Sequence, residues 1–208
     1  MSAFLKDFLS FPIRALFIFD RDRFRLTSLR TERFRHVARE VDGICLDVGC
    51  GPGNLFVKRF LKGKGKGVDV FMYEGLRKED MVDPLKLPFR DSSFDTATLI
   101  AAINHIPKNK RGKELAEIFR ILRTDGRIIV TMGNPIAEII VHRLSRMLNK
   151  EDMDTKRGMD KDETCYIRDA EIKNLLTAAG FGNLSKKRFW SQWGLNHMII
   201  GEKKEGFR

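Results

Sequence analysis

The feature that most constrains this chain is a short apolar segment that runs directly into a cluster of glycines. Ile44–Val48 has the composition of a buried strand with one acid inside it, and the sequence Gly49-Cys50-Gly51-Pro52-Gly53 follows at once. The next stretch, from Leu55 to Leu61, has the composition of a helix. A strand that passes through glycines into a helix brings bare backbone N–H groups close to a bound ligand. The segment therefore predicts an α/β fold with a ligand site at the end of this strand.

The spacing of the glycines narrows the kind of ligand. A dinucleotide-binding turn requires G-x-G-x-x-G, and Asn54 occupies the position of the last glycine. The pattern found here is G-x-G-x-G, with Asp47 two residues before the first glycine. A second apolar segment, GVDV, brings Asp69 to the end of the next strand, where a carboxylate can accept two hydrogen bonds from a ribose diol. The alternative role for Asp69 is a surface acid that caps the following turn.

These residues resemble the motifs of the class I S-adenosylmethionine-dependent methyltransferases. The resemblance continues through the D-P-L-K-L-P-F stretch at 83–89 and the F-D pair at 94–95, and it covers residues 41–204. It is closest to the small-molecule branch of the ubiquinone/menaquinone-biosynthesis type, also called type 11. The family implies S-adenosylmethionine as the cofactor and S-adenosylhomocysteine as its product.

The resemblance also implies a set of cofactor-binding positions. Asp47 would face the ammonium group, Asp69 the ribose, and Asp83 the adenine amino group. Pro84 departs from the family pattern, because it lacks the backbone N–H that donates to adenine in many relatives. The full predicted set is Asp47, Gly49, Cys50, Gly51, Gly53, Asp69, Val70, Asp83, Ile100 and Ala101.

Alternating strand and helix patterns predict a Rossmann-like, doubly wound α/β fold. We expect a mostly parallel, seven-stranded sheet with helices on both faces and a closing antiparallel hairpin at 184–190 and 197–203. Amphipathic patterns predict helices at 114–122 and 169–180. The expected organisation is an N-terminal amphipathic helical cap over 1–40 and a methyltransferase domain over 41–208, with 134–165 as a cap insertion.

The N-terminal segment is unusually apolar. Residues 4–19 hold 11 apolar side chains, but charges interrupt the run and no cleavage site follows, so it is neither a membrane span nor a signal peptide. Leu5, Leu9, Ile13 and Leu16 recur at helical spacing, and Pro12 should divide any helix here. Three interpretations remain open for the segment: packing against the main domain, a lid over the acceptor, and peripheral contact with an anionic membrane.

The charge balance and the cysteines bear on partners and compartment. The chain has 39 Lys and Arg against 28 Asp and Glu, a formal net charge of +11 that is spread evenly along the sequence. Nucleic acid is a possible partner but not the favoured one, because the 95–100 strand ends in AAINHI rather than the N-P-P-[YF] pattern used on exocyclic base amines. An odd number of scattered cysteines indicates a reducing, cytoplasmic setting and predicts no metal site.

The predicted reaction is methyl transfer to a small or lipophilic acceptor by in-line displacement. Proximity and orientation can supply much of the rate, and a base is needed only where the acceptor loses a proton. His105 is the candidate base; His142, Tyr166 and His197 are weaker candidates. Two alternatives stay open: a methyltransferase acting on RNA or another macromolecule through its basic surface, and a non-catalytic cofactor-binding partner module.

Overall fold

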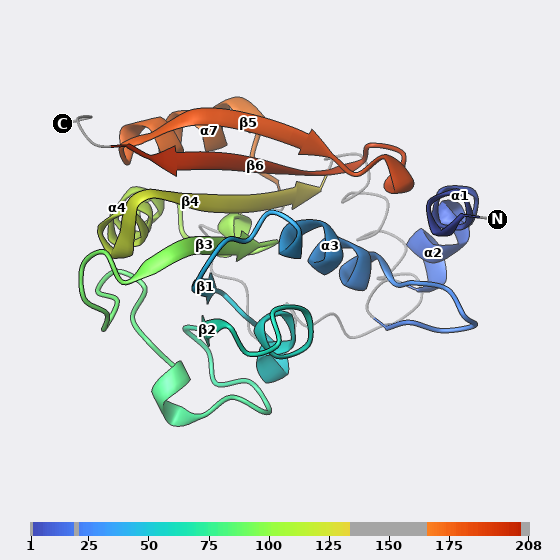
Figure 1. The fold of residues 1–208 in the computed structure, drawn as a ribbon, viewed down its shortest axis with the longest axis horizontal. Helices are drawn as coiled ribbons and strands as arrows, with labels where there is room; N and C mark the ends of the chain where they lie inside the picture. Colours follow the sequence, from blue (N-terminus) through green and yellow to red (C-terminus); the bar gives the residue numbers. More distant parts are fainter. Residues whose placement is uncertain (1, 19–20, 134–165, 205–208) are drawn as a thin grey trace.

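The computed structural model describes residues 2–18, 21–133 and 166–204, which build one sheet with helices on both faces (Figure 1). The strand order is β2-β1-β3-β4-β6-β5. The strands are β1 (Cys45–Val48), β2 (Gly65–Val68), β3 (Phe94–Ile100), β4 (Leu122–Gly133), β5 (Phe181–Arg188) and β6 (Asn196–Lys203). Strands β2, β1, β3 and β4 are parallel, and β6 runs antiparallel to both β4 and β5.

The described part also contains five α-helices, three of which precede β1, and several shorter helical turns. The α-helices are α1 (Ala3–Leu9), α2 (Phe11–Phe17), α3 (Leu29–Ala38), α4 (Arg111–Ile121) and α7 (Asp169–Ala178). The shorter turns are η1 (Pro52–Asn54), η2 (Phe56–Phe60), η3 (Lys78–Asp80), η4 (Ile103–His105) and η5 (Trp190–Gln192). None of the described helices is long and apolar enough to cross a membrane.

Both faces of the sheet are buried, and side chains alternate between two cores. In β4, Ile128 and Val130 pack in the core that α4 and α7 cover, whereas Ile129 between them packs in the core under α3 and η2. Figure 1 shows α3 on one side of the sheet and α7 on the other. Strands buried on both faces read as continuous apolar runs, which explains the sequence pattern of β3 and β4.

The sheet has six strands in the described residues, where the sequence predicts seven. Between β2 and β3, only an isolated parallel bridge joins Asp69 to Met81. The short helical turn η3 precedes the bridge, and Pro84 and Pro88 follow it without the N–H groups that a ladder needs. The chain therefore touches the sheet at this point and leaves it again.

The N-terminal segment forms two short helices, as the position of Pro12 predicts. Helix α1 ends at Leu9 with Ser10 as its C-cap, and Pro12 lies in the first turn of α2. The apolar stripe faces solvent at Leu5, Leu9 and Ile13, which are all exposed. The side that packs against the rest of the protein contains Arg14, which is fully buried, together with the buried Phe11 and Ile18.

Buried polar bonds attach this helical pair to distant parts of the chain. Arg14 donates from Nη1 to Oε2 of Glu32 in α3 at 2.8 Å and from Nη2 to the backbone oxygen of Ser191 in η5 at 3.3 Å. Gln192 donates to the same Glu32 oxygen at 2.8 Å. Burial alone would raise the pKa of Glu32, but hydrogen bonds from His36, Ser191, Gln192 and Arg14 outweigh it and lower the pKa to about 2. The pair is thus held by charge and hydrogen bonds.

We expect Arg14→Ala to destabilise the protein by about 3–5 kcal/mol at pH 7, because Glu32 is left buried without its cation. Urea unfolding measures the loss, and the exposed Arg21→Ala serves as the control, with an expected change within about 0.5 kcal/mol. The pKa of Glu32 is lowered on folding, so its contribution is present above pH 4.5 and is lost as the pH falls towards 2. The two proteins should converge in stability over that range; equal stability at pH 7 would contradict the assignment.

Candidate active site

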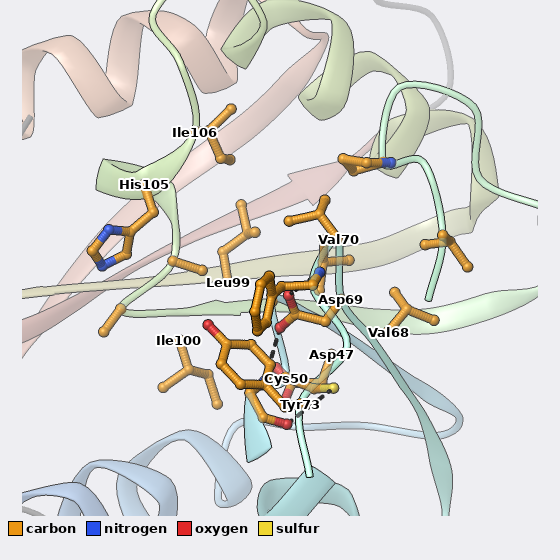
Figure 2. A pocket seen from close by; sticks show the side chains of 18 of the residues that line it. Asp47, Cys50, Val68, Asp69, Val70, Tyr73, Leu99, Ile100, His105 and Ile106 are labelled. Carbon is orange, nitrogen blue, oxygen red and sulfur yellow. Dashed lines mark hydrogen bonds between the residues drawn. The ribbon is translucent and has the colours of Figure 1, made fainter. Parts of the chain in front are cut away.

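A cavity of about 820 Å³ lies at the carboxyl ends of β1, β2 and β3 (Figure 2). Its lining includes nine of the ten predicted cofactor-binding residues and the candidate base. These are Asp47, Gly49, Cys50, Gly51, Asp69, Val70, Asp83, Ile100, Ala101 and His105. Residues from four separate parts of the sequence therefore meet where the glycine loop predicted a ligand site.

The glycine loop is held against the end of β2 by its own backbone. The N–H groups of Gly49 and Cys50 both donate to the carbonyl oxygen of Val68, at 2.9 and 3.1 Å. Gly51 follows with φ 63° and ψ −169°, a conformation that is essentially restricted to glycine. A Cβ built on Gly51 would meet no atom within 4 Å, so the loop presents open backbone to the cavity.

Gly53, the last glycine of the motif, is not among the residues that line the cavity. Its N–H donates to the carbonyl oxygen of Glu74 at 2.9 Å, and its φ is 70°. A Cβ added to Gly75 would come within 3.1 Å of the Gly53 Cα, so the two backbones pass close together. The structure gives Gly53 a conformational role in shaping the loop.

Asp69 joins the glycine loop to the segment after β2 through its two carboxylate oxygens. Oδ2 accepts from the Gly51 N–H at 3.0 Å, and Oδ1 accepts from the Phe71 N–H at 3.1 Å. Each carboxylate oxygen has capacity for a second hydrogen bond. Asp69 therefore orders the glycine loop while it remains able to accept hydrogen bonds from a ligand in the cavity.

Asp47 lies deeper, at the end of β1. Its Oδ1 accepts from the Thr98 hydroxyl at 2.6 Å, and the residue is almost entirely buried. Burial raises the pKa of Asp47 to about 7; the Thr98 hydrogen bond opposes the rise, and the charge of Asp69 adds to it. A cationic ligand nearby would favour the ionised carboxylate, so the site suits a ligand with an ammonium or sulfonium group.

Glu114 is a further acid in the lining that the sequence analysis missed. It lies in the first turn of α4, is buried, and has its pKa raised to about 7 by burial and then by the charges of Asp69 and Asp83. The sequence placed it only at the start of an amphipathic helix, and no motif signals its role. Among the described residues, these acids do not form a cluster suited to hold a metal ion.

Cationic and aromatic side chains also reach the cavity from segments outside the motif. Arg30, Arg33 and Phe34 come from α3, Tyr73 follows β2, and Lys110 precedes α4. Arg30 and Arg33 belong to no site motif in the sequence, because their approach to the cavity depends on how α3 packs.

His105 belongs to η4 and lines the cavity. Figure 2 shows it on one side, apart from Asp69 and Tyr73 near the centre. Its Nε2 lies 3.2 Å from Nδ2 of Asn104. Of the weaker candidates, His197 does not line the cavity, and its Nε2 lies 2.7 Å from Oδ1 of Asp169. His142 falls outside the described residues.

A sequence match across most of the chain identifies the protein family to which it belongs. The profile of the family described as "Methyltransferase domain" matches residues 19–186, so the chain belongs to that family. The predicted class, an S-adenosylmethionine-dependent methyltransferase of class I, is thereby confirmed, and S-adenosylmethionine is the cofactor of this class.

Two curated relatives share part of the chain. The protein named "Putative methyltransferase" from Encephalitozoon cuniculi is 29% identical over 107 residues, which is 48% of this chain and 50% of that protein. The methyltransferase GfsG of Streptomyces halstedii is 34% identical over 112 residues, 46% of this chain and 37% of that protein. The aligned regions span half or less of these relatives' own lengths.

Solved structures show the same fold at low sequence identity. A SAM-dependent methyltransferase from Thermotoga maritima superposes with a TM-score of 0.59 at 19% identity, covering 97% of this chain and 94% of that one. The 1,6-didemethyltoxoflavin-N1-methyltransferase of Burkholderia thailandensis gives a TM-score of 0.57 at 19% identity, covering 85% of this chain and 78% of that one.

The cavity fits the cofactor of the class. Its volume falls in the range typical of cofactor sites. The open side of Gly51 allows close approach to backbone N–H groups, and the acids Asp47, Asp69 and Glu114 match a ligand that carries a sulfonium and an ammonium group. The described residues therefore suit S-adenosylmethionine in shape and in charge.

We expect Glu114→Gln to make the free protein more stable at pH 8 than the parent, with a smaller difference at pH 5. The folded protein raises the pKa of Glu114 from 4.5 to about 7, so the parent loses stability as the pH rises through this interval. The amide does not titrate, and the gain should grow by roughly 2–3 kcal/mol between the two pH values. Urea unfolding at each pH measures it.

Glu117→Gln is the matched control from the same helix. The pKa of Glu117 is lowered, first by its hydrogen bond from Arg120, so this variant should lose stability relative to the parent as the pH rises. If the stability of both variants relative to the parent changed in the same direction with pH, the prediction that Glu114 is buried without a compensating charge would be contradicted.

Proposed function

We propose that this chain transfers the methyl group of S-adenosylmethionine to a small or lipophilic acceptor by in-line displacement. The observation that carries the proposal is the composition of the cavity. Its glycine and carboxylate groups gather near the ends of β1 and β2, while Phe34, Leu55, Leu85 and Ile106 add apolar lining. One cavity thus offers a polar anchor for the cofactor and apolar surface for an acceptor.

The proposed cofactor contacts follow the order of elements around the cavity. The Gly49–Gly51 backbone and Asp47 hold the methionine end, and Asp69 accepts from the ribose hydroxyls. Val70 and Asp83 hold the adenine. The placement of all these residues in one lining supports the assignment. Pro84 also lines the cavity and cannot donate a backbone hydrogen bond there.

The chemistry that the cofactor supplies is an electrophilic methyl group on a sulfonium. The work of the chain's own residues is to bind, orient and exclude water, because an aligned nucleophile held in contact reacts without a large entropic cost. Ile100 and Ala101 end β3 at the cavity, and the Ala101 N–H donates to the Thr131 hydroxyl at 2.9 Å, which fixes the strand end. His105 is the residue we propose as base where the acceptor must lose a proton.

The Burkholderia neighbour supports a small acceptor for this fold, since its structure contains 1,6-didemethyltoxoflavin and S-adenosylhomocysteine together. The predicted cap insertion at 134–165 lies outside the described residues. Of the predicted N-terminal cap over 1–40, α3 contributes Arg30, Arg33 and Phe34 to the lining, whereas α1 and α2 contribute no residue to it.

Asp69→Ala should weaken binding of S-adenosylmethionine by roughly 2–3 kcal/mol, because it removes charge-assisted hydrogen bonds to the ribose and releases the glycine loop. Titration calorimetry on the folded variant measures the change. Asp80→Asn is the control, since Asp80 is equally buried and close in sequence but pairs with Arg77 outside the lining. Equal losses in the two variants would indicate a general structural effect instead of ribose binding.

Two separate incubations test the acceptor class. Both contain the protein and methyl-labelled S-adenosylmethionine; one adds a solvent extract of small molecules and lipids, and the other adds purified total RNA. We expect label in the organic-soluble fraction, and His105→Gln should reduce its rate by about 100-fold with unchanged cofactor affinity if the acceptor loses a proton. Label in RNA alone would overturn the small-acceptor proposal, and an absence of transfer with normal cofactor binding would favour a partner module.

A further inference from the structure

An apolar surface extends over the outward side of α1 and α2 and continues onto η5. Its large exposed side chains are Phe4, Leu5, Phe8, Leu9, Ile13, Phe17, Trp190 and Trp193. Leu9 is 62% exposed and Trp190 is 60% exposed. We call this set the N-terminal apolar surface. Contiguous exposed patches of this kind mark interaction sites in folded proteins.

Elements far apart in the sequence build this surface as one unit. Phe8 and Phe11 both contact the ring of Trp193, with centroids 6.2 and 5.2 Å away, and Phe4 stacks on Phe8 at 6.1 Å. The indole N–H of Trp193 donates to the carbonyl oxygen of Phe8 at 3.0 Å. The rings are therefore held in place on a folded surface.

The tight turn before α3 adds another exposed aromatic side chain, Phe24. Arg23 and Leu26 exchange backbone hydrogen bonds at 3.3 and 2.8 Å, and the two residues between them, Phe24 and Arg25, have φ values of 53° and 59°. Residues other than glycine rarely adopt this backbone conformation. The turn brings Phe24 to its tip with 84% of its surface exposed, and Lys6 of α1 donates to the backbone oxygen of Arg25. Figure 1 shows this turn beside α1 and α2 at one end of the molecule.

The charges next to the apolar groups indicate what the surface binds. Arg21, Arg23 and Arg25 are exposed around Phe24. Two described acids of the same segment have partners of their own: the Asp22 carboxylate accepts from the Ser28 N–H, and Asp7 lies 3.8 Å from Arg14. Exposed aromatic and aliphatic groups beside arginines match the interface of an anionic bilayer, where rings enter the headgroup boundary and cations meet phosphates. A second copy of the chain would bring the same arginines together, which disfavours self-association.

We infer that α1, α2, the 21–26 turn and η5 form a docking surface for anionic lipid membranes. Docking itself does not depend on methyl transfer, but its use to collect a lipophilic acceptor rests on the proposed function. Helix α3 contacts Arg14 through Glu32 and lines the cavity through Arg30, Arg33 and Phe34. A single helix therefore lies between the docking surface and the cavity.

The experiment uses the full chain and vesicles of phosphatidylcholine, alone or mixed with phosphatidylglycerol. The chain has two tryptophans, and both belong to the docking surface. Their emission should shift to shorter wavelength on addition of the anionic vesicles, and the protein should sediment with them. Leu9→Ser combined with Phe24→Ser should lower the partition coefficient about 10-fold or more. Arg21→Gln, Arg23→Gln and Arg25→Gln together should remove the preference for anionic lipid.

Ile44→Ser is the matched control, because Ile44 is also an exposed large aliphatic residue but lies just before β1. It should bind vesicles as the parent does, and circular dichroism and cofactor calorimetry should show that all variants are folded. The inference is overturned if the parent binds neither kind of vesicle, or if the Leu9/Phe24 variant binds as well as the parent. Self-association of the parent that Leu9→Ser abolishes would assign the surface to a second copy. Vesicle binding is measured without acceptor or turnover, so its failure is distinct from failure of the proposed function.

Discussion

The geometry of the site depends on how β1 is registered against β2. Pairing of Val48 with Val68 brings the carbonyl oxygen of Val68 under the N–H groups of Gly49 and Cys50, and brings Asp69 within reach of Gly51. A slip of β1 by one residue would reverse the direction of every side chain in that strand. The glycine loop would then move away from Asp69, and Asp47 would lose its hydrogen bond from Thr98. A backbone register therefore determines which carboxylates face the cavity.

That arrangement concentrates buried acids in one place and has an energetic cost. Asp47 and Glu114 both have pKa values raised to about 7, with burial as the first cause and neighbouring carboxylates among the others. The free protein therefore holds protons near neutral pH that an ionised carboxylate in water would release. A ligand with cationic groups favours the ionised forms, so part of its binding free energy comes from charges that are unfavourable in its absence. The same groups thus lower the stability of the free protein and favour a cationic ligand.

Local features of the site were predictable from the sequence, and those created by packing were not. The glycine loop and Asp69 depend on residues close in the chain, and the motif places both correctly at one cavity. Glu114 and the α3 residues reach the cavity only because α4 and α3 pack against opposite faces of the sheet. The outward direction of Leu5, Leu9 and Ile13 could not be predicted, because periodicity does not reveal that Arg14 meets a buried acid. The seventh strand is not confirmed in the described residues, where an isolated bridge joins Asp69 to Met81.

The exposure of the N-terminal apolar side chains follows from how the segment is attached. Its polar neighbours at the point of contact are Glu32 of α3 and Ser191 and Gln192 of η5, all three buried. An aliphatic side chain in the place of Arg14 would leave the buried Glu32 carboxylate without its cation, at a cost greater than the gain from burying one aliphatic side chain. Arg14 must therefore face inward, on the same side as the buried Phe11, and Leu5, Leu9 and Ile13 on the other side of the short helices face solvent. The bonds that fasten the segment to the protein are thus also what makes its outer surface apolar.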